Sequence, residues 1–127
     1  FGAVDFFRMV PVAYLLYTNG HTERANYLFD GMLEEMAKPE ARGVGTLDAF
    51  IHYIRGDFDK AAAALRTAID NSVFLAWWYY RSPIYDGMRT DPELGALLEE
   101  MEAEIVRQRQ WYLDNRNKPL LDLMQPN

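Results

Sequence analysis

The stretch that decides the fold occurs twice, first as Gly20-His21-Thr22-Glu23-Arg24-Ala25 and again, 36 residues later, as Gly56-Asp57-Phe58-Asp59-Lys60-Ala61. An apolar and aromatic segment of helical spacing precedes each copy, at residues 13–17 and 49–53, and another follows it. Glycine suits the left-handed residue that ends a helix, and Thr22 or Asp57 can cap the free amide groups of the next helix. The repeated stretch therefore predicts two helix–turn–helix hairpins.

The rest of the chain shows the same three- and four-residue spacing of apolar residues and no sustained alternation, which predicts an all-α protein of five or six helices. Asp91 followed by Pro92 starts the longest helix, expected at roughly 92–114. Pro11 removes a helical hydrogen bond, so the first helix either kinks there or a helix begins there. The apolar stripe of the longest helix comprises Leu94, Leu98, Met101, Ile105 and Tyr112.

The composition bounds the function. Of the 127 residues, 50% are hydrophobic and the net charge is -6, which favours one folded domain and disfavours binding to nucleic acid. The longest apolar runs, residues 10–16 and 73–80, are less than half of the ~20 residues that a membrane helix needs. No cysteine is present, which excludes disulfides and cysteine-ligated zinc. We expect a soluble, cytoplasmic domain, and the start at Phe1 without an initiator Met indicates a piece of a longer protein.

Both hairpins share an alanine in the first helix, a tyrosine or other bulky group near its middle, glycine at the turn, and small and large apolar residues in the second helix. This pattern resembles the tetratricopeptide repeat over roughly residues 7–72. The resemblance implies a right-handed stack of antiparallel helix hairpins. The repeat is degenerate, because it exceeds the ~34 residues of that family and His52 stands where an aromatic residue is usual. The family's close helix approaches correspond to Ala13, Ala25, Ala49 and Ala61.

A third unit begins at residues 74–80, but its turn is stretched over residues 81–90 and its second helix is the long one. We interpret it as a capping unit, because terminal repeats are atypical. The repeat domain is thus expected at 1–114 and an apolar tail at 115–127. The tail lies across the helices as an extended cover or packs on another copy of the chain, so a homodimer is one expectation. Its apolar residues are Leu120, Leu121, Leu123 and Met124.

Residues 83–94, followed by Leu97 and Leu98, also resemble the end of the helical-repeat region of bacterial multidomain regulators. In those proteins the repeats follow a winged-helix DNA-binding domain or a nucleotide-cyclase domain. The resemblance implies that DNA-binding or catalytic chemistry would lie elsewhere in the parent protein.

A row of aromatic residues is the candidate site. Aligned with the tetratricopeptide repeat, the row faces the concave side of the stack, and tyrosine and tryptophan suit a groove that binds a peptide or linker. The alternative is that the rings form the core between the hairpins. The predicted partner-binding residues are Tyr14, Tyr17, Phe50, Tyr53 and Trp78.

Catalytic, metal and phosphate motifs are lacking. His21 falls in a predicted turn and is interpreted as a solvent-exposed residue, while His52 on an inward helix face is interpreted as a core histidine. No histidine pair has the spacing of a helix-borne metal site, and residues 99–104 lack the loop pattern of a calcium site. We therefore expect no enzyme activity, no cofactor and no metal.

The sequence favours a non-catalytic interaction or regulatory module of a larger bacterial protein, which binds a peptide, a linker or another domain on a concave helical surface. The alternative is a small-molecule sensor in which the aromatic groove closes on a ligand. An enclosed cavity with convergent polar groups would favour the sensor, and an open groove would favour the peptide.

Overall fold

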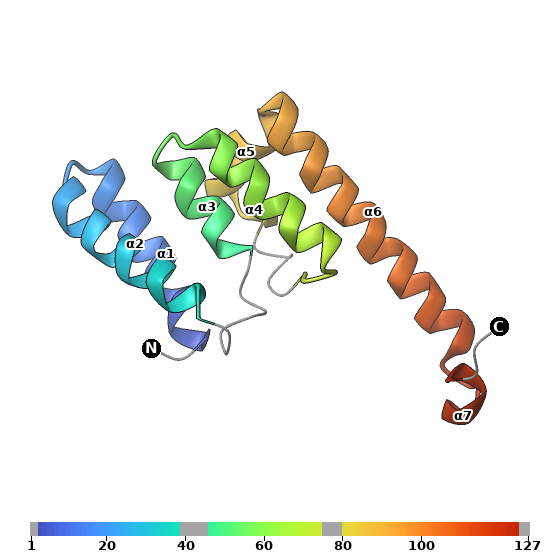
Figure 1. Ribbon diagram of the computed structural model, residues 1–127. Helices are drawn as coiled ribbons and strands as arrows, with labels where there is room; N and C mark the ends of the chain where they lie inside the picture. The colour runs from blue at the N-terminus through green and yellow to red at the C-terminus, as the bar shows by residue number, and fades with distance from the viewer. Residues whose placement is uncertain (1–2, 39–45, 75–79, 125–127) are drawn as a thin grey trace.

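Every regular element of the computed structural model, which describes residues 3–38, 46–74 and 80–124, is a helix (Figure 1). The all-α prediction is confirmed, although these residues form seven α-helices rather than five or six. Pro11 lies inside the first helix, so no helix begins there. The elements are α1 (Ala3–Thr18), α2 (Thr22–Met36), α3 (Leu47–Ile54), α4 (Phe58–Asp70), the 3₁₀ helix η3 (Pro83–Tyr85), α5 (Asp86–Thr90), α6 (Pro92–Asn115) and α7 (Leu120–Leu123).

The two predicted hairpins are formed by α1 with α2 and by α3 with α4. Gly20 and Gly56 lie at the turns with φ of 85° and 79°, the left-handed conformation that glycine adopts without a steric penalty. The predicted caps differ: His21 rather than Thr22 precedes α2, and neither His21 nor Asp57 caps its helix through its side chain. The turns therefore depend on the glycines rather than on side-chain caps.

Small residues bring the helices of each hairpin together. Ala25 on α2 and Ala61 on α4 have no exposed surface, and the same holds for Ala13 on α1 and Ala49 on α3. The large residues that follow in the second helices are buried at equivalent positions as well. The 36-residue offset thus relates equivalent buried positions in the two hairpins.

The hairpins lie side by side, and α3 of the second contacts both α1 and α2 of the first (Figure 1). Arg55, just after α3, reaches back to the first hairpin: its Nη2 lies 2.7 Å from Oδ1 of Asp30, and its Nε donates to Oδ1 of Asn26 at 3.0 Å. Its guanidinium also lies 5.4 Å from the ring centroid of Phe29. Arg55 therefore links the end of α3 to α2 by charge and by packing.

The predicted third unit is described only in part. Its expected first helix lies largely in residues 75–79, outside the described residues, and the expected stretched turn contains η3 and α5. Pro83 begins η3 with a preset φ, and Tyr85 and Met88 are completely buried. The segment forms short helices rather than an open turn because these side chains are anchored in the core.

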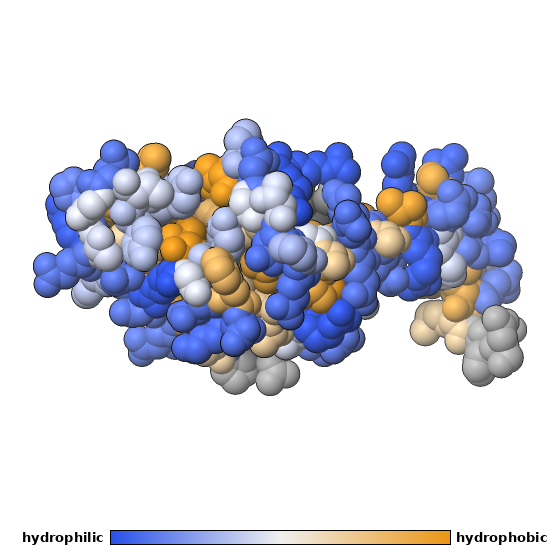
Figure 2. Space-filling view, turned by 90° about the horizontal axis from the view of Figure 1, so that it is seen from above, coloured by the Kyte–Doolittle hydropathy of each residue, from blue (hydrophilic) through white to orange (hydrophobic). Residues whose placement is uncertain are grey.

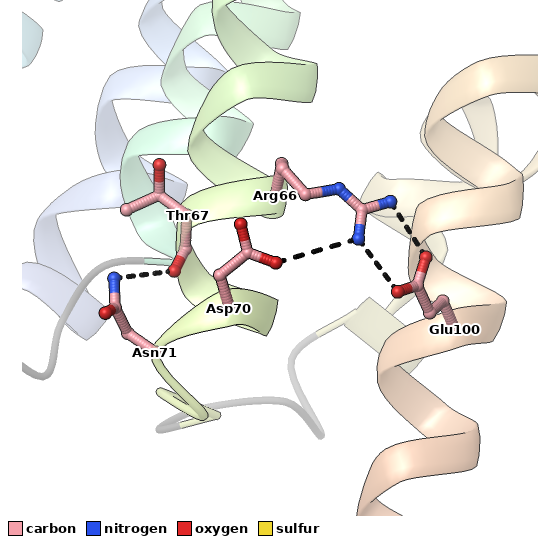
Figure 3. A network of polar contacts seen from close by, with 5 residues as sticks. All are labelled: Arg66, Thr67, Asp70, Asn71 and Glu100. Atoms are coloured by element: carbon pink, nitrogen blue, oxygen red, sulfur yellow. Dashed lines mark hydrogen bonds and ion pairs between the residues drawn. The ribbon is translucent and has the colours of Figure 1, made fainter.

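The long helix α6 follows its predicted bounds closely. Oδ1 of Asp91 accepts hydrogen bonds from the backbone amides of Glu93 and Leu94, at 3.0 and 2.9 Å, which confirms the predicted cap. The first half of α6 packs on α4 and α5. Figure 3 shows how Arg66 of α4 joins it, through two 2.8 Å contacts with the carboxylate of Glu100.

The second half of α6 extends away from the other helices and leads to α7 (Figure 1). Leu94, Leu98 and Met101 of the predicted stripe are buried, but Tyr112 is 60% exposed, so the stripe does not continue as core. The extended cover predicted for the tail is also wrong. Leu120 and Leu121 belong to the short helix α7 and are 72% and 75% exposed. We call residues 106–124 the arm.

Among the residues that the structure describes, no helix combines the length and the apolar character needed to cross a membrane.

Candidate functional site

A cavity of about 410 Å³, open to solvent on one side, lies where the two hairpins meet η3 and α5. The predicted residues Tyr14, Tyr17 and Tyr53 all line it. None of the ten lining residues is charged, so the groove offers aromatic rings, hydroxyl groups and aliphatic surface. Its other lining residues are Thr18, Ile54, Gly56, Phe58, Pro83, Ile84 and Gly87.

Tyr14 and Tyr17 come from the last turns of α1, and each is half-buried. The ring of Tyr14 lies 5.9 Å from that of Phe50, and the ring of Tyr17 lies 6.2 Å from that of Phe29, measured between centroids. Each tyrosine therefore packs against the core and also lines the groove. This dual placement suits a tyrosine because its ring is apolar and its hydroxyl is polar.

Tyr53 near the end of α3 is held between two neighbours. Its ring stacks on Phe58, with centroids 5.7 Å apart and an interplanar angle of 29°. Its hydroxyl lies over Gly87, where an added Cβ would come within 1.9 Å of the Tyr53 oxygen. Gly87 thus leaves the space that the Tyr53 hydroxyl occupies.

The three tyrosine hydroxyls have no hydrogen-bond partner in the described part of the chain. A phenol hydroxyl can both donate and accept. The groove therefore presents polar groups that are available to a ligand beside apolar surface.

Phe50 requires a correction. It has no exposed surface, and its ring centroid lies 4.0 Å from that of Tyr85, so it is a core residue and cannot contact a partner. Alignment with the first hairpin identified the correct helix, but Phe50 faces inward where Tyr14 is half-buried. The predicted Trp78 lies outside the described residues.

Sequence reasoning missed the contributions of Phe58, Pro83 and Ile84 to the groove. Phe58 follows Tyr53 by five residues across the turn at Gly56, and this pair of aromatic residues is a signal in the sequence that could have placed it. Pro83 and Ile84 lie in the segment without a counterpart in the repeat, so no alignment could place them.

The histidines do not form a reactive centre. His21 is exposed, as predicted, whereas His52 is half-buried rather than a core residue. Partial burial, together with the nearby charge of Lys60, lowers the pKa of His52 and favours its neutral form. Within the described residues no group of three or more histidine, aspartate or glutamate side chains is arranged to hold a metal ion.

One partly buried carboxyl group lies outside the groove. Asp48 in the first turn of α3 accepts a hydrogen bond from the amide of Ala49 at 2.8 Å, and burial raises its pKa to about 6. Nearby, the buried hydroxyl of Tyr80 donates to the carbonyl oxygen of Thr46, and burial also raises its pKa. These groups fix the start of α3 and line none of the groove.

Comparison of the chain with protein-family models, with curated proteins and with solved structures found no match. The function is therefore inferred from the groove itself.

Proposed function

We propose that the chain is a non-catalytic interaction module that binds an extended, uncharged polypeptide segment in the groove formed by Tyr14, Tyr17 and Tyr53. The observation that carries the proposal is the convergence of these three half-buried rings on one open and uncharged cavity, with hydroxyls that have no hydrogen-bond partner among the described residues. Extended segments commonly bind to aromatic-lined grooves through packing and a few hydrogen bonds. The segment would belong to a partner protein or to another domain of the same regulatory protein.

The arrangement of the hairpins supports a tetratricopeptide-like stack as part of this proposal. In a stack, the first helix of one hairpin packs on both helices of the preceding hairpin, and α3 contacts α1 and α2 in this way. The buried Ala25 and Ala61 occupy equivalent positions in the two units. Such stacks bind partners on the surface formed by successive first helices, here α1 and α3.

A small-molecule sensor is the second candidate, but the openness of the groove favours the peptide. Small-molecule sites enclose most of the ligand surface and combine apolar walls with a few placed polar or charged groups. This groove is open on one side and carries no charged lining residue.

The test is a selection of random linear peptides displayed on phage against the chain, followed by calorimetric titration of the enriched peptides. We expect Tyr17→Ala and Tyr53→Ala each to weaken binding by more than about 1 kcal/mol. The matched control is Tyr27→Ala, because Tyr27 is 80% exposed on α2 and lines none of the groove.

A thermal melt of each variant separates loss of the groove from loss of the fold. Weaker binding with a normal melt supports the proposal. Failure to enrich any peptide contradicts it, as does equal binding to all three variants.

A further inference from the structure

One face of α6 runs without interruption from its first half, which packs on α4 and α5, into the arm. Seven residues at alternating spacings of three and four share this face because the helix has 3.6 residues per turn. The first two belong to the half of α6 that packs on α4 and α5, the sixth lies in the exposed half, and the seventh directly follows the last residue of the helix. They are Gly95, Leu98, Glu102, Ile105, Arg109, Tyr112 and Arg116.

The first half of this face borders a cavity of about 400 Å³. Gly95, Leu98 and Met101 contribute its apolar lining from α6. Glu99 and Glu102 add carboxylates from the same helix. Arg81 and Arg89 line the cavity as well, and Nη2 of Arg81 lies 3.4 Å from Oε1 of Glu102. This part of α6 therefore borders a depression with apolar walls and charged groups of both signs.

The second half of the face carries Tyr112 between Arg109 and Arg116, and exposed apolar residues lie on it or beside it. Val106, Tyr112 and Leu113 are 66%, 60% and 41% exposed, and the leucines of α7 follow them. Figure 2 shows this end of the molecule projecting beyond the other helices, with hydrophobic residues on its surface. Exposed apolar groups that gather on a projecting helix are typical of a contact surface.

The charges of α6 are separated along its length. Residues 92–106 contain five glutamates and no lysine or arginine, whereas residues 107–118 contain four basic residues and a single aspartate. Two antiparallel copies of the helix would bring the acidic half of each against the basic half of the other. Parallel copies would align like charges instead, which is unfavourable.

We infer that α6 is a self-association surface, on which a second copy of this chain packs antiparallel. The apolar arm of each copy then covers the depression beside Gly95 and Leu98 of the other, and the basic arm faces Glu99 and Glu102. Both copies use the same patch, so the contact closes as a two-fold dimer and does not propagate.

Light scattering after size-exclusion chromatography and sedimentation equilibrium of the 127-residue chain test the inference. We expect a dimer whose dissociation constant rises with salt, because the facing charges are screened. Glu99→Lys with Glu102→Lys reverses the acidic charges beside the depression, and Arg109→Glu with Arg116→Glu reverses the basic charges of the second half. Each double variant alone should weaken self-association by roughly tenfold or more.

An equal mixture of the two double variants should form a heterodimer, because both sets of facing charges are then complementary. The control is Trp111→Gln, since Trp111 is 54% exposed on the opposite side of α6 and its loss should leave the dimer intact. A wild-type chain that remains a monomer at the highest concentration reached overturns the inference. So does a dimer that neither double variant weakens while its thermal melt stays normal.

Discussion

The helical body, which comprises α1 to α5 and the first half of α6, and the arm have similar spacing of apolar residues but differ in how far those residues are buried. In the body, the first half of α6 buries Leu94, Leu98 and Met101 against α4 and α5. In the arm, the same helix continues with the same spacing of large residues, yet Val106, Trp111 and Tyr112 are more than half exposed. Periodicity therefore predicts a helix and its apolar side, whereas burial depends on the presence of a neighbouring helix.

The largest expected effect in the body is that of Gly95→Ala. An added Cβ would come within 2.4 Å of the backbone carbonyl oxygen of Arg89, so α5 or α6 would have to move. We expect a loss of about 3 kcal/mol in the free energy of unfolding, measured with urea. The control is Gly31→Ala in α2, where a Cβ meets nothing within 4 Å and a gain of up to about 1 kcal/mol is expected. Equal effects of the two substitutions would contradict the close approach of α5 and α6.

Ala61→Leu should have the next largest effect, because Ala61 has no exposed surface at the contact between α3 and α4. Forcing a larger side chain into this contact is expected to cost about 1–3 kcal/mol. The denaturation midpoint measures the cost, and Ala63→Leu on the exposed side of the same helix should leave it almost unchanged. An unchanged midpoint for Ala61→Leu would show that the hairpin is not closely packed there.

Asp48→Asn tests how the stability of the helical body depends on pH. The pKa of Asp48 is raised from 3.8 to about 6, so the stability that depends on its neutral form is complete below 3.8 and is lost as the pH rises through about 6. We expect the asparagine variant to be more stable than the wild type by about 1–3 kcal/mol near pH 8, and similar to it near pH 4. Urea unfolding across this range measures the difference. A gain that does not vary with pH would exclude ionisation of Asp48 as its cause, and Asp59→Asn at an exposed position is the control.

The smallest effect is expected in the arm. Trp111→Gln removes a large aromatic ring, but the ring is 54% exposed and lies outside the buried core. The free energy of unfolding should change by no more than about 0.5 kcal/mol. A loss of several kcal/mol would show that the arm is part of the cooperative core, which would remove the contrast between the two regions.

The sequence predicted those features that depend on local signals. Gly20 and Gly56 marked both turns, Asp91 marked the start of α6, and the 36-residue offset identified buried alanines in both hairpins. These features need only a backbone conformation, a cap or a periodicity.

The rest depends on contacts between distant segments. Phe50 is buried because it packs on Tyr85, which lies 35 residues away in a segment outside the repeat. The link from Arg55 to Asp30 and the contributions of Pro83 and Ile84 to the groove arise in the same way. A pattern within one helix cannot indicate which distant residue will cover it.

The separation of charge along α6 has a consequence for the arm even before it meets another molecule. The peptide dipoles of a helix leave its first turn partly positive and its last turn partly negative. Glu93 lies in the first turn, and Arg116 and Lys118 follow the last one, so the side-chain charges oppose the partial charges at both ends. In between, Nε of Arg107 donates to Glu104 at 2.7 Å, one helical turn away, which lowers the pKa of Glu104 to about 2. The arm can therefore stay helical in water and meet a partner already ordered, which reduces the entropy that is lost on association.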